Sequence, residues 1–152
     1  MKEIDTVSIY LFKEDKILLL YRNKKENDIN HNKYIGVGGH IELGETSDIA
    51  IDREVKEETN FDIISKKYVA KINFVFDDFK EHMYLYTSND FKGEMKECNE
   101  GTLEWIPLTK LNEIPMWEGD KYFLNPILKG EPFNEFTMIY EGDKLISVKK
   151  EN

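Results

Sequence analysis

A short acidic segment constrains this chain more than any other feature of its sequence. In residues 53–61, REVKEETNF, the carboxylates Glu54, Glu57 and Glu58 fall within five positions. At about 100° per residue they occupy an arc of about 100° on a helix surface, and like charges at this spacing weaken a helix. A solvated acidic face is the ordinary explanation of such a run. The alternative is a bound cation that relieves the repulsion.

The residues around the acidic run predict a helix over 46–59. Thr46 or Ser47 can cap its N-terminus through a side-chain oxygen. Ile51 and Val55 are four positions apart, so they share a face that can pack against a sheet. The carboxylates are therefore expected at the edge of the core.

The rest of the chain alternates between strand and turn signals. Strands are expected over 6–12, 16–22, 67–76, 81–88 and 102–108, a strand running into a glycine-rich loop over 34–45, and a hairpin over 133–148. Residues 23–33 are polar and predict a loop. Helical segments are expected over 108–114 and 117–130, the second broken near Pro126. The pattern indicates one α+β domain over 1–152, with a mixed sheet and two or three helices.

Composition excludes several function classes. The net charge of −9 argues against stable nucleic-acid binding, which usually needs a basic face. An anionic substrate would need a cation as mediator. Cys98 is the only cysteine, so no intrachain disulfide can form and a reducing cytosol fits. No apolar run suggests a signal peptide or a membrane span, so a cytoplasmic protein is expected.

The acidic helix belongs to a longer spaced pattern. Gly39 is followed after five residues by Glu45, and after seven more by Arg53 and Glu54, then Val55, Glu57, Glu58, Asn60 and Phe61. This resembles the signature of the Nudix (MutT-like) hydrolases, in which glycine stands at the position of Asn60. The departure is mild, because asparagine tolerates a left-handed backbone best after glycine. The resemblance implies the Nudix fold, a mixed sheet between helices in an α/β/α sandwich.

The resemblance also implies roles for individual residues. The implied ligands of Mg²⁺, or of Mn²⁺ as a substitute, are Glu54, Glu57, Glu58 and the backbone carbonyl of Gly38. Arg53 would orient the glutamates, and Glu45 would support it as a further acid. The implied chemistry is attack by a metal-activated water on a phosphorus of a nucleoside diphosphate linked to another group. Glu57 would take part in this catalysis.

Many members of the family use a further glutamate from outside this segment as a ligand or general base. Glu97, Glu100 and Glu104 are available, and Glu100 matches best because it stands five residues before Trp105. An ordinary loop acid is the alternative. Arg22, at the end of a predicted strand, is a candidate phosphate contact or a solvated strand end.

The C-terminal half resembles the oxidised-purine nucleoside triphosphatase branch, that of 8-oxo-dGTP diphosphatases. On that model Trp117 stacks on the base and Asp120 hydrogen-bonds its edge; otherwise Trp117 packs the helix and Asp120 caps a turn. Ile35 stands where that branch has a base-reading asparagine, which should relax base selection. Phe74 and Phe76 share one strand face and could line the same pocket or belong to the core.

The sequence therefore predicts an enzyme, a Mg²⁺-dependent pyrophosphohydrolase that cleaves a nucleoside triphosphate to the monophosphate and pyrophosphate. Oxidised purine nucleotides are the favoured substrates. The alternatives are another nucleoside diphosphate derivative or an RNA 5′ end. A non-catalytic Nudix ligand sensor is the alternative from another class, although such domains typically lose the glutamates retained here. The predicted partner is a small nucleotide substrate, and no membrane association is expected. The sequence carries no signal for an oligomeric state.

Overall fold

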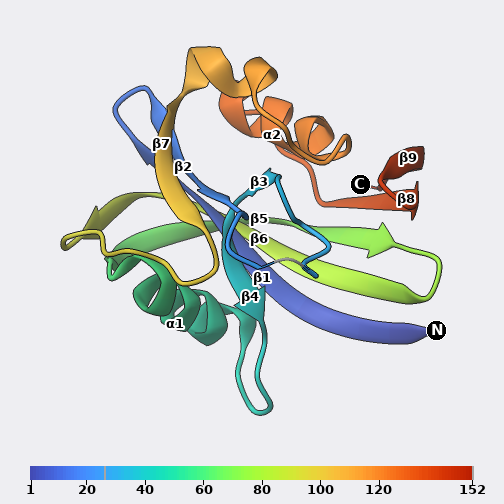
Figure 1. Cartoon of the computed structure of the whole chain (residues 1–152), viewed down its shortest axis with the longest axis horizontal. Helices are drawn as coiled ribbons and strands as arrows, with labels where there is room; N and C mark the ends of the chain where they lie inside the picture. Colours follow the sequence, from blue (N-terminus) through green and yellow to red (C-terminus); the bar gives the residue numbers. More distant parts are fainter. Residues whose placement is uncertain (26, 152) are drawn as a thin grey trace.

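The computed structural model describes residues 1–25 and 27–151, and Figure 1 shows the whole chain. Glu26, in the predicted polar loop, and Asn152, at the end of the predicted domain, lie outside the described residues. The strands are β1 (Lys2–Lys13), β2 (Lys16–Tyr21), β3 (Tyr34–Ile35), β4 (Val37–His40), β5 (Asp62–Val75), β6 (Phe79–Lys92), β7 (Thr102–Pro107), β8 (Glu135–Glu141) and β9 (Lys144–Glu151). The helices are α1 (Ser47–Thr59), the 3₁₀ helix η1 (Leu108–Glu113) and α2 (Asp120–Lys129).

In the described part of the chain the strands form a nine-stranded mixed sheet. The order is β3-β2-β1-β6-β5-β8-β9, with β4 paired to β1 and β7 paired to β2. The pairs β1–β6 and β5–β8 are parallel, whereas the other pairs are antiparallel. The predicted mixed sheet is confirmed. Parallel pairing brings β6 beside β1, so residues far apart in the sequence share one sheet face.

The two α-helices cover opposite faces of this sheet (Figure 1). Ile51 and Val55 of α1 are fully buried in one apolar cluster, together with Ile9 of β1. Phe123 of α2 packs in the other cluster with Tyr10, the next residue of β1, as the alternation of a strand requires. The α/β/α prediction is confirmed. No helix within residues 1–25 and 27–151 is long and apolar enough to cross a membrane.

The ends of α1 agree with the sequence signals. Thr46 is the N-cap, and its Oγ1 accepts a hydrogen bond of 3.2 Å from the backbone N–H of Ile49. Asn60 ends the helix in the left-handed conformation with φ 73°, and its N–H donates to the carbonyl of Lys56. This conformation explains why asparagine can replace glycine here.

Several elements differ from the prediction. Strand β6 is longer than predicted at both ends and β5 at its N-terminal end, because the two strands pair with each other along most of their length. The segment 108–114 forms a 3₁₀ helix. The predicted break near Pro126 is wrong, since α2 contains Pro126 without interruption. The buried side chains of Phe123 and Leu124 hold α2 on the sheet despite the hydrogen bond that proline removes.

The cap at Asn60 gives a stability prediction. Asn60→Ala should lower the free energy of unfolding by about 1 kcal/mol relative to Asn60→Gly, because a β-carbon is disfavoured in the left-handed region. Both variants lose the side-chain hydrogen bond to the carbonyl of Glu94, so the comparison isolates the backbone effect. Urea unfolding measures the difference, and equal midpoints would contradict the assigned conformation.

Candidate active site

The acidic helix is attached to β4 through Glu58. Its side chain is buried, at 6% exposure, and Oε2 accepts a hydrogen bond of 3.0 Å from the backbone N–H of Gly38. Oε1 is also buried and accepts no hydrogen bond from a donor among the described residues. A buried carboxylate oxygen without a donor is costly. Burial, and after it the neighbouring acids Glu100 and Glu54, raises the pKa of Glu58 to about 9.

Arg53 gathers the remaining acids around one guanidinium. Its Nε and Nη2 donate to both carboxylate oxygens of Glu45, at 2.6 and 2.9 Å. Its Nη1 donates to Glu54 at 2.8 Å and to Glu57 at 3.2 Å, and Nη2 also donates to the carbonyl of His40. Hydrogen bonds from Arg53, and then from the backbone of Glu42, lower the pKa of Glu45 to about 2. Arg53 therefore both neutralises and orients the cluster.

Two glycines of β4 let the backbone approach these groups. A β-carbon on Gly39 would lie 2.6 Å from the carboxyl carbon of Glu54. A β-carbon on Gly38 would lie 1.9 Å from the carbonyl oxygen of Val7 on β1. The first contact involves a side-chain end and the second involves backbone. Glycine at position 39 therefore makes room for a carboxylate, and glycine at position 38 permits the pairing of β4 with β1.

Of the three further glutamates considered, Glu100 lies beside the acidic helix. Its carboxylate lies 3.7 Å from Nη1 of Arg22 and 3.3 Å from Nζ of Lys25. Partial burial opposes ionisation, but a hydrogen bond from the protonated carboxyl of Glu58 and the charge of Arg22 lower the pKa of Glu100. Glu97 instead pairs with Lys24.

The third glutamate is turned elsewhere. Glu104 of β7 interacts with the hydroxyl of Tyr34, and this contact raises the pKa of Tyr34 to about 12. Arg22, the candidate phosphate contact, donates from Nε to Oδ2 of Asp28 at 2.6 Å and faces the same cavity as Glu100.

The donor set suits a hard divalent cation. The acids Glu54 and Glu100 line one cavity with the backbone of Gly38, and carboxylate oxygens are the ligands that Mg²⁺ prefers. Oε1 of Glu58 is a further oxygen, which accepts no hydrogen bond among the described residues. Within the described residues no three acidic, histidine or cysteine side chains already form a ligand group. An ion at this place would share Glu54 and Glu57 with Arg53.

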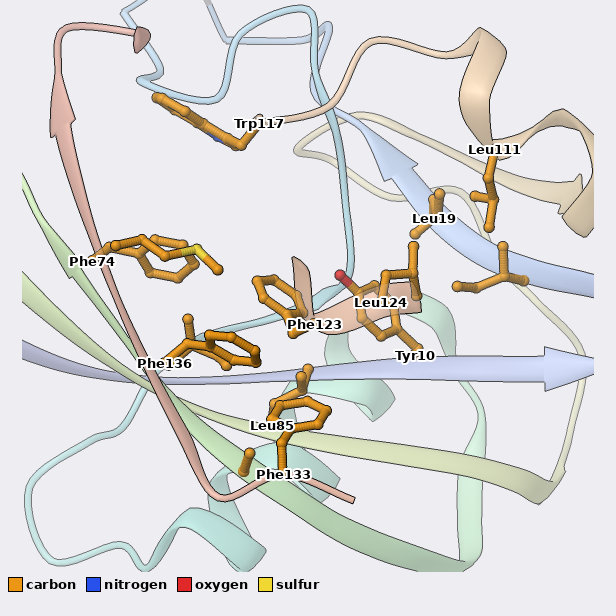
Figure 2. Packing of buried hydrophobic residues seen from close by; sticks show 14 of the residues in the cluster. Tyr10, Leu19, Phe74, Leu85, Leu111, Trp117, Phe123, Leu124, Phe133 and Phe136 are labelled. Carbon is orange, nitrogen blue, oxygen red and sulfur yellow. The ribbon is translucent and has the colours of Figure 1, made fainter. Parts of the chain in front are cut away.

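The cavity has a volume of about 520 Å³ and continues from these acids to an aromatic region. It brings together the predicted residues Arg22, Ile35, Gly38, Glu54, Phe74, Glu100, Trp117 and Asp120, together with Phe76. Trp117, Phe74 and Phe123 all line this cavity, and Figure 2 shows how the three side chains lie. Flat apolar walls of this kind suit an aromatic ring.

Trp117 is held in place on several sides. Its Nε1 donates a hydrogen bond of 2.7 Å to Oδ1 of Asn30, and Nζ of Lys33 lies 4.4 Å from the ring centre. Its ring makes edge contacts with Phe76 and Tyr140, at centroid distances of 5.7 and 5.1 Å. The indole thus packs in the apolar core and also lines the cavity. Its packing role is confirmed, and its stacking on a base stays a prediction. Asn30 was missed, because nothing in a polar loop singles out one amide.

Asp120 is the first residue of α2 and is buried at 6% exposure. Its carboxyl has no hydrogen-bond partner within residues 1–25 and 27–151, and the residue before it is the N-cap, without a side-chain capping bond. The alternative that Asp120 caps a turn is therefore not supported. Burial, followed by the charge of Glu81, raises the pKa of Asp120 to about 8.

Glu81 of β6 is the second acid at this end of the cavity, and the sequence interpretation missed it. It lies opposite Phe74 in the β5–β6 register and accepts a hydrogen bond of 2.7 Å from Oγ1 of Thr6. A signal was available, because Glu81 shares the period-two face of Met83 and Leu85. A charged residue at an inward strand position is unusual.

The fold and the arrangement of acids indicate the class of protein: a hydrolase with a carboxylate cluster beside a cavity that has aromatic walls. Residues 2–125 match the family model described as the NUDIX domain. The chain belongs to the Nudix family of pyrophosphohydrolases, which generally use a divalent metal and bind small nucleotides, and it acts on a pyrophosphate substrate.

Individual relatives are distant. The Nudix hydrolase YvcI of Bacillus subtilis is 27% identical over 134 residues, which cover 84% of this chain and 80% of that protein. The oxidized purine nucleoside triphosphate hydrolase of Danio rerio is 24% identical over 127 residues, covering 82% and 81%. The crystal structure of a mutator MutT protein from Bacillus halodurans superposes with a TM-score of 0.85 at 24% identity and covers 96% of each chain. This last likeness concerns the fold.

The pocket acid gives a pH prediction. Because the folded state keeps the proton of Asp120 up to about pH 8, whereas an ordinary aspartate loses it near 3.8, stability should fall as the pH rises between these values. Tyr10, Glu81 and Tyr140 are the titratable groups that face it. Asp120→Asn should flatten this part of the profile, measured by thermal unfolding.

Asp77→Asn makes the same replacement at an exposed aspartate and should keep the wild-type slope. If the stability of the wild type and of Asp120→Asn changed with pH in the same way, Asp120 would not retain its proton in the folded state.

Gly39 gives a second prediction for this site. Gly39→Ala should fold, because the new β-carbon meets only the mobile end of Glu54. The displaced carboxylate should lower metal-dependent hydrolysis by about 10- to 100-fold, the usual effect of misplacing a catalytic group by about 1 Å. Melting temperature and kcat/KM measured side by side separate the two effects. Full activity would show that the position of Glu54 does not matter.

Proposed function

We propose that this chain is a single Nudix domain that hydrolyses a nucleoside triphosphate to the monophosphate and pyrophosphate, with oxidised purine nucleotides such as 8-oxo-dGTP as favoured substrates. The observation that carries the proposal is one cavity that joins the acidic cluster to an aromatic pocket containing the unpartnered Asp120. A nucleotide has the same order of parts, with charged phosphates at one end and a flat base at the other.

At the phosphate end, Gly38, Glu54, Glu57, Glu58 and Glu100 would hold Mg²⁺, or Mn²⁺ in its place. When bound, the ion would supply an activated water and offset charge on the leaving phosphate. Glu57 and Glu100 are the candidates that accept the proton of the attacking water, since both carboxylates are partly exposed. Arg53 and Glu45 are positioning residues that act through Glu54 and Glu57.

Arg22 would complete the phosphate end from the other side. Its guanidinium lies 3.7 Å from the Glu100 carboxylate and lines the cavity. A cation there favours the charged substrate and its charged product alike. It also keeps Glu100 ionised, which a proton acceptor requires.

At the base end, Trp117 would stack on the purine with Phe74 and Phe76 as further walls, and Asp120 would bind the ring edge. A carboxyl kept neutral by burial can donate as well as accept a hydrogen bond. Ile35 offers no such group, so base selection rests on the acids of the pocket. The similarity to the oxidized purine nucleoside triphosphate hydrolase of Danio rerio supports this substrate class.

The decisive experiment is turnover of 8-oxo-dGTP with Mg²⁺, beside ordinary nucleoside triphosphates, ADP-ribose and a triphosphorylated RNA. We expect pyrophosphate to be released preferentially from 8-oxo-dGTP, and Glu57→Gln to lower kcat by about 100-fold or more. Chromatography of the products distinguishes pyrophosphate from phosphate.

Activity confined to another substrate of this set would reject the oxidised-purine proposal and retain the hydrolase. Metal-dependent stabilisation without any turnover would instead favour a ligand sensor. Glu97→Gln is the matched control, because that exposed acid lies away from the cluster and should leave turnover unchanged.

A further inference from the structure

Glu81 occupies a position that a plain sheet core would not give to an acid. It lies between β1 and β5 in the sheet, opposite Ile4 on one side and Phe74 on the other. Phe79 and Met83, two positions before and after it, line the same cavity. A carboxyl on an inward strand face costs free energy unless a partner compensates it. The expected compensation is either a protein group or a ligand.

The protein supplies only part of that compensation. Thr6 donates to Oε2 of Glu81 at 2.7 Å, whereas Oε1 has no hydrogen-bond partner among the described residues. Asp120 faces the same cavity and is only 6% exposed. Neither of its carboxyl oxygens has a hydrogen-bond partner among the described residues. Three of the four carboxyl oxygens at this end of the cavity are therefore free to bind a ligand.

We propose that Glu81 is a second base-reading residue, which accepts a hydrogen bond from an exocyclic amino group while Asp120 binds the neighbouring ring positions. The inference rests on the proposed function, because it takes the cavity to hold the base of a nucleotide. It names the substrate class more closely: a purine with an amino group beside a ring N–H, as in guanine and 8-oxoguanine.

The surroundings favour a base over a second cation. The walls next to the two acids are largely aromatic, from Phe74, Phe76 and Trp117, and the neighbouring Thr6 hydroxyl is already used as a donor to Glu81. A cation such as Mg²⁺ requires about six oxygen ligands, and no third acidic, histidine or cysteine side chain joins the two acids in the part of the chain described. A flat ring with two N–H donors satisfies both the aromatic walls and the acceptors.

The test compares substrates that differ only in the amino group, dGTP and dITP. The wild type should prefer dGTP in kcat/KM, because a site built to bind a polar group rejects the analogue that lacks it. Glu81→Met, which keeps the length and removes the acceptor, should lower this dGTP/dITP ratio by about tenfold or more. Thr6→Val, which removes the donor that orients Glu81, should lower the ratio less.

Glu3→Gln is the matched control. Glu3 lies on the neighbouring strand β1, is exposed and pairs with His82, so the same loss of charge occurs outside the cavity. This control should keep the wild-type ratio. Melting temperatures verify that each variant folds, and Glu81→Gln serves as a second variant of Glu81 with the native shape.

Calorimetric binding of dGMP and dIMP separates the two proposals, since it needs no turnover. If the wild type binds dGMP more tightly and Glu81→Met loses this preference, the inference stands even when no triphosphate is hydrolysed, and only the proposed function fails. An unchanged dGMP/dIMP preference in Glu81→Met overturns the inference. So does a wild type that does not distinguish the two nucleotides, whatever its catalytic activity.

Discussion

The ion-pair network of Arg53 is the interaction on which the acidic end of this structure depends. A helix with Glu54, Glu57 and Glu58 on one side is weakened by repulsion, and Arg53 offsets that repulsion while it also holds Glu45. The same guanidinium ties the helix to β4 through the carbonyl of His40. These contacts, together with the packing of Ile51 and Val55 and the hydrogen bond from Gly38 to Glu58, hold α1 and the acidic end of the cavity against the sheet.

Two buried acids share one property, incomplete compensation by the protein. Oε1 of Glu58, in the acidic cluster, accepts no hydrogen bond among the described residues, and Asp120 has an unpartnered carboxyl in the cavity. Such groups reduce stability in the free protein, and sites that bind ligands commonly retain this kind of cost. In the function that we propose, a divalent cation would compensate Glu58 and a base edge with N–H donors would compensate Asp120. We therefore regard the unpaired acids as the best guide to what the cavity binds.

Much of the fold followed from local patterns. The helix over 46–59 was predicted because apolar spacing, the cap at Thr46 and the left-handed position at Asn60 all act within a few residues. The strands were found but their lengths were underestimated, since pairing between β5 and β6 extends both beyond their apolar cores. The break near Pro126 was wrong because packing of α2 against the sheet outweighs one lost hydrogen bond.

The sequence by itself determined the family and the acidic helix with its carboxylates, because these depend on the spacing of residues within one contiguous segment. Only the tertiary structure decided which distant residues complete the site. It placed Glu100 beside Glu58, and it set Glu81 opposite Phe74 and in one cavity with Asp120. The reason is physical: strand register and the docking of α2 are fixed by pairing and packing between segments far apart in the chain, and no local spacing records them.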